Sequence, residues 1–101
     1  MVSIRMDLLD KRNVMEYIIN HQPERHMFTT ELEGHTAYVE YRLQNGSLDI
    51  IHTIVPPPLE GRGIAAALVK RAYEYAAEQS LKPEATCSYA VRWLERHPEV
   101  K

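Results

Sequence analysis

The stretch between residues 48 and 66 constrains the fold of this chain more than any other. An apolar run, Leu48–Val55, meets three prolines, Pro56–Pro58, and the glycines Gly61 and Gly63 then open a helix-like pattern. Proline removes a backbone donor and ends a strand. Glycine lets the backbone approach a ligand closely, and the first turn of a helix has free N–H groups. The stretch therefore predicts a strand, a loop and a helix whose start binds phosphate through its main chain.

Two known phosphate loops fit the glycine spacing. Gly61-x-Gly63-x-x-Ala66 satisfies the dinucleotide fingerprint, with Glu84 near the position of its ribose-binding acid, and also the x-x-G-x-[GA] core of the acyl-CoA loop in N-acetyltransferases. A dinucleotide fold needs a second half, and only 35 residues follow Ala66, from 67 to 101. No Gly-Lys-Ser/Thr follows, which excludes a P-loop. The spacing and its context favour an acyl-CoA loop.

The remaining hydrophobic pattern predicts a small mixed fold. Strand-like alternation covers 27–33, 36–43 and 81–87, with hairpin turns expected at Glu33-Gly34-His35 and Asn45-Gly46, and Pro83 suits an edge strand or a strand start. Helical periodicity covers 10–21, 61–79 and 89–96, with Ser88 as the expected cap of the last helix. The apolar stripe expected on the helix over 61–79 consists of Ala65, Leu68, Val69, Ala72 and Ala76. Strand 48–55 is apolar on both faces, so we expect a central strand covered on both sides. In a regular strand His52 shares a face with Leu48, Ile50 and Ile54.

Composition narrows the functional classes. The net charge of −2 argues against general nucleic-acid binding, and the single cysteine, Cys87, excludes an internal disulfide and a cysteine metal cluster. The five histidines have no metal-ligand spacing on one element, so we assign no metal. No segment has the length and hydrophobicity of a signal peptide or a membrane span. We therefore expect a cytoplasmic protein with no nucleic-acid or membrane partner.

Four motifs in order carry a resemblance to a known family. They are His52-Thr53-x-Val55-Pro56, Glu60-Gly61-Arg62-Gly63-Ile64-Ala65, Cys87-Ser88-Tyr89 and His97-Pro98-Glu99. Together they resemble the small, single-domain branch of the GNAT superfamily, the YjdJ-type N-acetyltransferase-like proteins. The resemblance covers residues 23–101 and leaves 1–22 as an N-terminal extension, expected to be helical and dispensable for cofactor binding. It implies an α+β fold of the three-layer type, with a mixed, mostly antiparallel sheet and a central CoA-binding helix.

The resemblance also implies acetyl-CoA as co-substrate and assigns its binding residues. Acetyl-CoA enters between two splayed central strands. The strand carrying Thr53 and Val55 offers backbone groups to the pantetheine arm. Position 60, which is Gln or Arg in larger relatives, is Glu here, and we expect this carboxylate to point away from the phosphates. The pyrophosphate is expected on the loop and helix start, formed by Gly61, Arg62, Gly63, Ile64, Ala65 and Ala66.

Three side chains are candidates for the transfer chemistry. Cys87 is a possible nucleophile or general acid, or a small buried residue at a strand end. His52 is a possible general base, although a histidine on an apolar strand face is usually a hydrogen-bonded core residue. Tyr89 is a possible proton donor to a thiolate or an aromatic anchor for the last helix.

The function that follows is transfer of an acetyl group from acetyl-CoA to an amine. The sequence leaves the acceptor open, either a small molecule or a protein, and the protein is expected as a monomer or a homodimer. Two alternatives stay open: an acyl-CoA-binding module without acceptor chemistry, and a protein-interaction domain whose glycine loop is only a helix cap. CoA affinity separates the last from the others, and acetyl turnover separates the first two.

Overall fold

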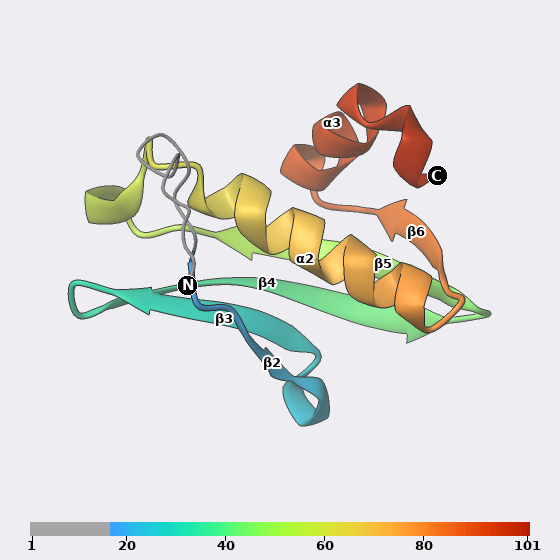
Figure 1. The fold of residues 1–101 in the computed structure, drawn as a ribbon, viewed down its shortest axis with the longest axis horizontal. Coiled ribbons are helices and arrows are strands. Elements are labelled where there is room, and N and C mark those ends of the chain that lie inside the picture. Colours follow the sequence, from blue (N-terminus) through green and yellow to red (C-terminus); the bar gives the residue numbers. More distant parts are fainter. Residues whose placement is uncertain (1–16) are drawn as a thin grey trace, which may run out of the picture.

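The computed structural model describes residues 17–101, which form an α+β fold with one mixed sheet (Figure 1). The strands of this region lie side by side in the order β2-β3-β4-β5-β6. All neighbours are antiparallel except β5 and β6, which are parallel. The element bounds are β2 Asn20–Gln22, β3 Met27–Leu32, β4 His35–Gln44, β5 Ser47–Ile54, α2 Ile64–Glu78, β6 Lys82–Ala85 and α3 Ser88–Arg96.

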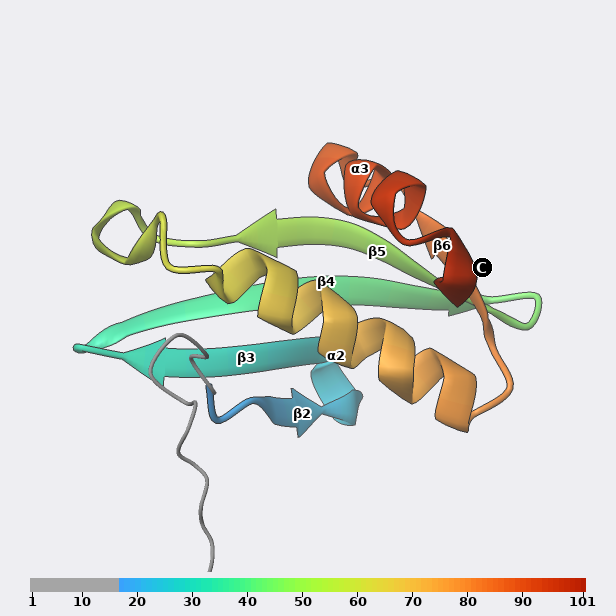
Figure 2. The ribbon, with the colours of Figure 1, turned by 45° about the horizontal axis from the view of Figure 1, so that its top comes forward.

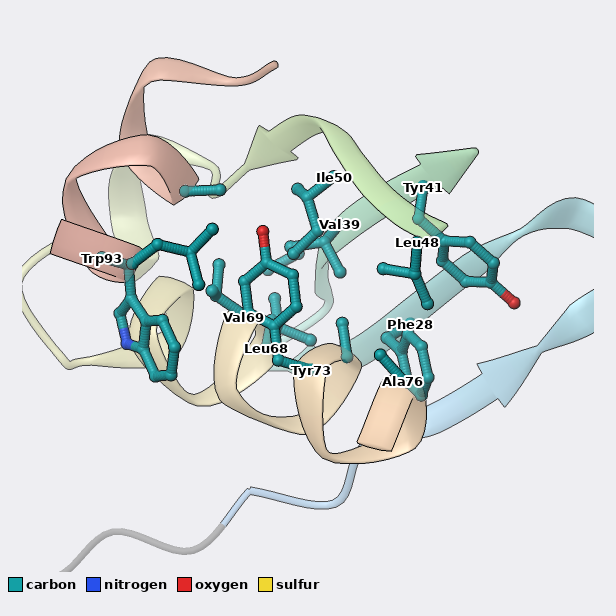
Figure 3. Close-up of a cluster of buried hydrophobic side chains, with 14 of the residues drawn as sticks. Phe28, Val39, Tyr41, Leu48, Ile50, Leu68, Val69, Tyr73, Ala76 and Trp93 are labelled. Carbon is teal, nitrogen blue, oxygen red and sulfur yellow. The ribbon is translucent and has the colours of Figure 1, made fainter. Parts of the chain in front are cut away.

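Helix α2 lies across one face of the sheet and forms the core with it (Figures 1 and 2). Its buried stripe contains Leu68, Val69, Ala72 and Ala76, four of the five positions that the periodicity predicts. Ala65, the fifth, is half-buried. The apolar side chains of β3, β4 and β5 point into this stripe (Figure 3). Those with no exposed surface are Phe28, Ala37, Val39, Leu48 and Ile50.

A β-bulge in β5 changes which face each side chain occupies. Tyr41 pairs with Ile50, but Glu40 pairs with His52, so Ile51 has no partner on β4. An extra residue in one strand reverses the alternation that follows. His52 therefore lies on the face away from α2, whereas Thr53, opposite Val39, lies on the α2 face. The prediction that His52 shares a face with Leu48 and Ile50 is wrong for this reason.

The prediction that β5 is covered on both sides is correct only for its first half. Ser47, Leu48, Asp49 and Ile50 are buried, but His52 is exposed and the exposed fraction of Ile54 is 44%. After the bulge, both side chains lie on the face away from α2, and the described part of the chain leaves them uncovered there. The apolar residues of this strand therefore lie in two environments, buried up to Ile50 and partly exposed beyond it.

Helix α3 packs beside α2 at the end of the sheet that carries β6 (Figure 2). The Trp93 ring meets the Tyr73 ring of α2 at 5.7 Å between centroids. The N-cap of α3 is Cys87 rather than the predicted Ser88, which is the first helical residue. Among residues 17–101, no helix has the length and hydrophobicity needed to cross a membrane.

The predicted helix over residues 10–21 is wrong where the structure describes it. Residues 10–16 lie outside the described part, and residues 20–22 form the edge strand β2 instead. His21 stacks on Phe28 at 4.1 Å between ring centroids, and its Nε2 lies 2.6 Å from Tyr41 Oη. Burial, followed by the charge of Arg71, lowers the pKa of His21, which favours a neutral ring in this cluster. The sheet therefore includes residues that sequence assigned to the extension.

Deletion of residues 1–22 is expected to destabilise the domain strongly. It removes β2 and uncovers Phe28, because Tyr17, Ile19 and His21 no longer pack against the core. Losing these half-buried side chains costs roughly 3 kcal/mol, or about 15 °C in melting temperature for a domain of this size. Thermal unfolding followed by circular dichroism measures the loss. A truncated protein that melts within about 3 °C of the full chain would show that β2 contributes little.

Candidate functional site

The candidate site lies where β5 and β6 part. Their parallel pairing ends at Ile50 and Ala85, and the Ile50 carbonyl then accepts the backbone N–H groups of both Thr86 and Cys87 at 3.0 Å. Beyond this point the chain turns away from β5 into α3, while β5 continues to Ile54 (Figure 1). The two strands form a fork whose open end lies at the carboxyl end of β5.

The register shows which backbone groups face into the fork. Tyr41 donates its backbone N–H to His26 on the β3 side, so the backbone groups of Glu40 point to β5. Alternate residues of a strand direct these groups to opposite sides. His52, the partner of Glu40, therefore directs its backbone N–H and C=O towards β4. Thr53, the next residue, directs its backbone N–H and C=O into the fork. An extended ligand can pair with this edge as an added strand would.

The glycine loop closes the outer end of the fork. Gly61 and Gly63 have φ values of +81° and +76°, a left-handed conformation that favours glycine, and Gly63 is the N-cap of α2. A Cβ at either position would meet no atom within 4 Å. The space above the loop is therefore open, and the first N–H groups of a 15-residue helix face it. Such an arrangement suits an anionic group.

A cavity of about 220 Å³ lies against this loop. Val55 forms its wall on the β5 side and Tyr89 its wall on the α3 side. Glu60 also lines the cavity as part of the loop. Every residue that the sequence assigns to the loop, except Arg62, is among the lining residues: Gly61, Gly63, Ile64, Ala65 and Ala66.

The Arg62 side chain holds the loop rather than facing the cavity. Its guanidinium forms two hydrogen bonds with the Glu33 carboxylate, at 2.8 and 3.1 Å, and a third with the Pro58 carbonyl. Hydrogen bonding and the charge of Arg62 lower the pKa of Glu33. Tyr17 donates its hydroxyl to the Arg62 carbonyl. These contacts tie the loop to the β3–β4 hairpin and to Tyr17, so the predicted role of Arg62 at the pyrophosphate falls to its backbone.

Cys87 lies inside the fork and faces the opposite strand. Its Sγ is 3.4 Å from Thr53 Oγ1, on the α2 side of the sheet. Burial opposes ionisation of the thiol, but hydrogen bonding to Thr53 and to the backbone N–H groups of Tyr89 and Ala90 outweighs it. The pKa of Cys87 is therefore lower than its usual value. A half-buried thiol at a helix start with a lowered pKa is suited to proton transfer or nucleophilic attack.

Tyr89 stands between the loop cavity and a larger groove. The groove, of about 670 Å³, runs between α2 and α3 and shares Ala66 and Tyr89 with the loop cavity. Burial raises the pKa of Tyr89, so its hydroxyl stays protonated near neutral pH. Lys70 and Arg96 line the same groove, together with Glu74 and Glu99. Sequence reasoning missed the groove, because its walls come from two helices that β6 separates in the chain.

The structure does not bring the third predicted catalytic residue into the fork. His52 is exposed on the face away from α2, beside Glu40, whereas Cys87 and Thr53 meet on the α2 face. Within residues 17–101, no group of three or more His, Cys, Asp or Glu side chains is arranged to hold a metal ion.

Comparisons with known proteins agree with this geometry. The model of the GCN5-related N-acetyl-transferase family matches residues 26–101. Protein NATD1 from Homo sapiens and from Gallus gallus is 36% identical over 84 residues, which cover 79% of this chain and 74% and 76% of those proteins. The solution structure of a GCN5-like protein from Staphylococcus aureus superposes with a TM-score of 0.66 at 31% identity, covering 83% of both chains. The chain therefore belongs to the GCN5-related N-acetyltransferase family.

Proposed function

We propose that this protein transfers an acetyl group from acetyl-CoA to a primary amine. The observation that carries the proposal is the proximity of the parts of the site along the chain: Val55 and Tyr89, which line the loop cavity, each lie two residues from the contact between Thr53 and the Cys87 thiol. A phosphate site alone would suit many nucleotides. A phosphate site that leads into an unpaired strand edge and ends at a thiol suits a phosphopantetheine thioester.

The cofactor is placed along this path by its chemistry. The pyrophosphate lies on the N–H groups at the start of α2, beside Gly61 and Gly63. The pantetheine arm pairs with the free backbone groups of Thr53 and Val55 and passes the Tyr89 ring. The nucleotide lies over the groove between α2 and α3, where Lys70 and Arg96 are available to the phosphate on its ribose.

The chain supplies two groups to the reaction in this arrangement. The neutral amine attacks the thioester carbonyl carbon, and backbone N–H groups on the open edge of β5 stabilise the oxyanion. As the C–S bond breaks, the Cys87 thiol gives its proton to the departing CoA sulfur. The proton lost by the amine goes to water or to a base on the acceptor side, and the Cys87 thiolate regains a proton from water before the next turnover. His52 can serve as that base only for an amine that enters from the face away from α2.

A second function is favoured by the position of His52. Because the sheet separates His52 from Cys87, the site has two candidate proton donors, Cys87 and Tyr89, but the predicted base does not face them. A protein of this kind can bind acyl-CoA without efficient transfer. The chain would then sense or carry acyl-CoA.

Titration and turnover together test both functions. Isothermal titration of the full chain is expected to give micromolar dissociation constants for CoA and acetyl-CoA. Release of CoA thiol in the presence of a panel of small amines and lysine peptides is expected to exceed the rate without acceptor. Binding without any amine-dependent release would support the acyl-CoA-binding module, and absence of binding would refute both functions.

A further inference from the structure

A buried carboxylate at the base of the fork has no role in the chemistry described so far. Asp49 of β5 is only 4% exposed. Its Oδ2 accepts hydrogen bonds from Thr86 Oγ1 at 2.8 Å and from Arg42 Nη2 at 3.0 Å. Its Oδ1 is buried and has no hydrogen-bond partner among the described residues. Burying a charged oxygen without a partner opposes folding, so the carboxylate calls for a local explanation.

Its position supplies that explanation. Asp49 pairs with Glu84 one residue before β5 and β6 part. On the backbone, the Ile50 carbonyl holds the N–H groups of both Thr86 and Cys87. On the side-chain level, Asp49 holds Thr86 at the same place. Two independent contacts therefore fix Thr86, and the next residue in the chain carries the thiol.

The charge of Asp49 strengthens the contact that matters for the thiol. A hydrogen bond to a carboxylate is roughly twice as strong as one between neutral groups. Arg42, whose side chain is 52% exposed, balances the charge from the solvent side without competing for the Thr86 hydroxyl proton. A neutral side chain at position 49 would bury more easily but would hold Thr86 less firmly.

We propose that Asp49 and Thr86 are positioning residues that fix the branch point of the fork and thereby hold the Cys87 thiol against Thr53. This inference rests on the proposed acetyl transfer for its effect on turnover, but the placement of the thiol is a separate property. A residue that only stabilised the sheet would change the melting temperature and leave the thiol as reactive as before. A positioning residue changes the reactivity of the thiol in a protein that is still folded.

Thr86→Val tests the proposal, because valine has the shape of threonine and lacks the hydroxyl. The kcat for amine acetylation is expected to fall about tenfold or more, with the KM for acetyl-CoA within about twofold of the parent. Alkylation of the only cysteine by iodoacetamide is expected to reach its midpoint at higher pH. Thr86→Ser keeps the hydroxyl and is expected to restore both. Thr36→Val is the matched control, because Thr36 is exposed and its hydroxyl meets only Glu31.

The outcomes separate this inference from the proposed function. A folded Thr86→Val protein with the alkylation profile of the parent overturns the inference, whatever its turnover. A shifted profile in a protein that acetylates no amine supports the inference and counts against the proposed function. If Thr86→Val does not fold, Thr86→Ala takes its place, since Thr86 is exposed and alanine also lacks the hydroxyl that Asp49 accepts. An unchanged alkylation profile in Thr86→Ala then overturns the inference.

Discussion

Replacing Gly63 with aspartate is expected to abolish CoA binding in a protein that still folds. The open space beside Gly63 accepts the new side chain without a clash, and that space is where the pyrophosphate is proposed to lie. A carboxylate about 4 Å from a phosphate charge costs roughly 4 kcal/mol at the dielectric typical of protein surfaces. The dissociation constant for CoA should therefore rise by at least about a hundredfold. Isothermal titration of the folded variant measures it.

The chain offers a matched control for the strain of this substitution. Gly46, in the turn between β4 and β5, has φ +78° against +76° for Gly63, and a Cβ there also meets nothing within 4 Å. Gly46→Asp therefore introduces the same charge and the same backbone strain far from the loop, and should bind CoA as the parent does. Gly63→Asn separates charge from bulk. Parental affinity in a folded Gly63→Asp protein would rule out the loop as the phosphate site.

Replacing Cys87 with serine is expected to lower kcat by about a hundredfold, the usual contribution of a general acid. Serine is a favoured N-cap, so α3 should keep its start, and CoA affinity should stay within about threefold of the parent. The parent rate should fall as pH rises through the pKa of Cys87, because only the protonated thiol can donate. Although burial opposes ionisation, hydrogen bonding to Thr53 and to the helix start lowers that pKa, so the decline should begin at a lower pH than for an ordinary thiol. Cys87→Ser should lack this decline.

Intact mass distinguishes proton donation from covalent catalysis. A nucleophilic thiolate would form an acetyl-cysteine with acetyl-CoA alone, and its rate would rise rather than fall with pH through the same pKa. We expect direct transfer, with no stoichiometric adduct in the absence of an amine. An adduct on Cys87 that an added amine discharges at the turnover rate would establish the covalent route. Cys87→Ala with parental turnover would leave the thiol with a packing role only.

Local patterns predicted the elements that depend on local rules. Alternation and turn chemistry located both hairpins, because Glu33-Gly34 and Asn45-Gly46 adopt the positive φ angles that tight turns need. The apolar stripe of α2 and the edge position of the strand with Pro83 followed from periodicity and from the missing proline donor. The glycine spacing predicted the loop for the same reason, because the loop conformation depends on the positive φ angles that glycine adopts without help from distant residues.

What the sequence could not predict depends on partners distant in the chain. Val14, Met15, Ile18 and Ile19 have helical spacing, yet the residues that follow pair with β3, because the sheet edge offers hydrogen bonds that outweigh local preference. The Arg62 side chain forms an ion pair with Glu33, 29 residues away, which no local sequence motif predicts. The groove between α2 and α3 exists only once both helices have docked on the sheet.

The unpaired Ile51 also bears on how related chains are compared. Before it, odd-numbered residues of β5 lie on the face away from α2, and after it they lie on the α2 face. One inserted residue thus exchanges the faces of all positions downstream, including Thr53. An alignment that opens a single-residue gap between Ile50 and Thr53 would equate a solvent-facing histidine with a residue that points into the fork. Residues of related chains in this segment should therefore be matched by their strand pairing. Where the pairing is not known, residues should be counted back from the glycine loop.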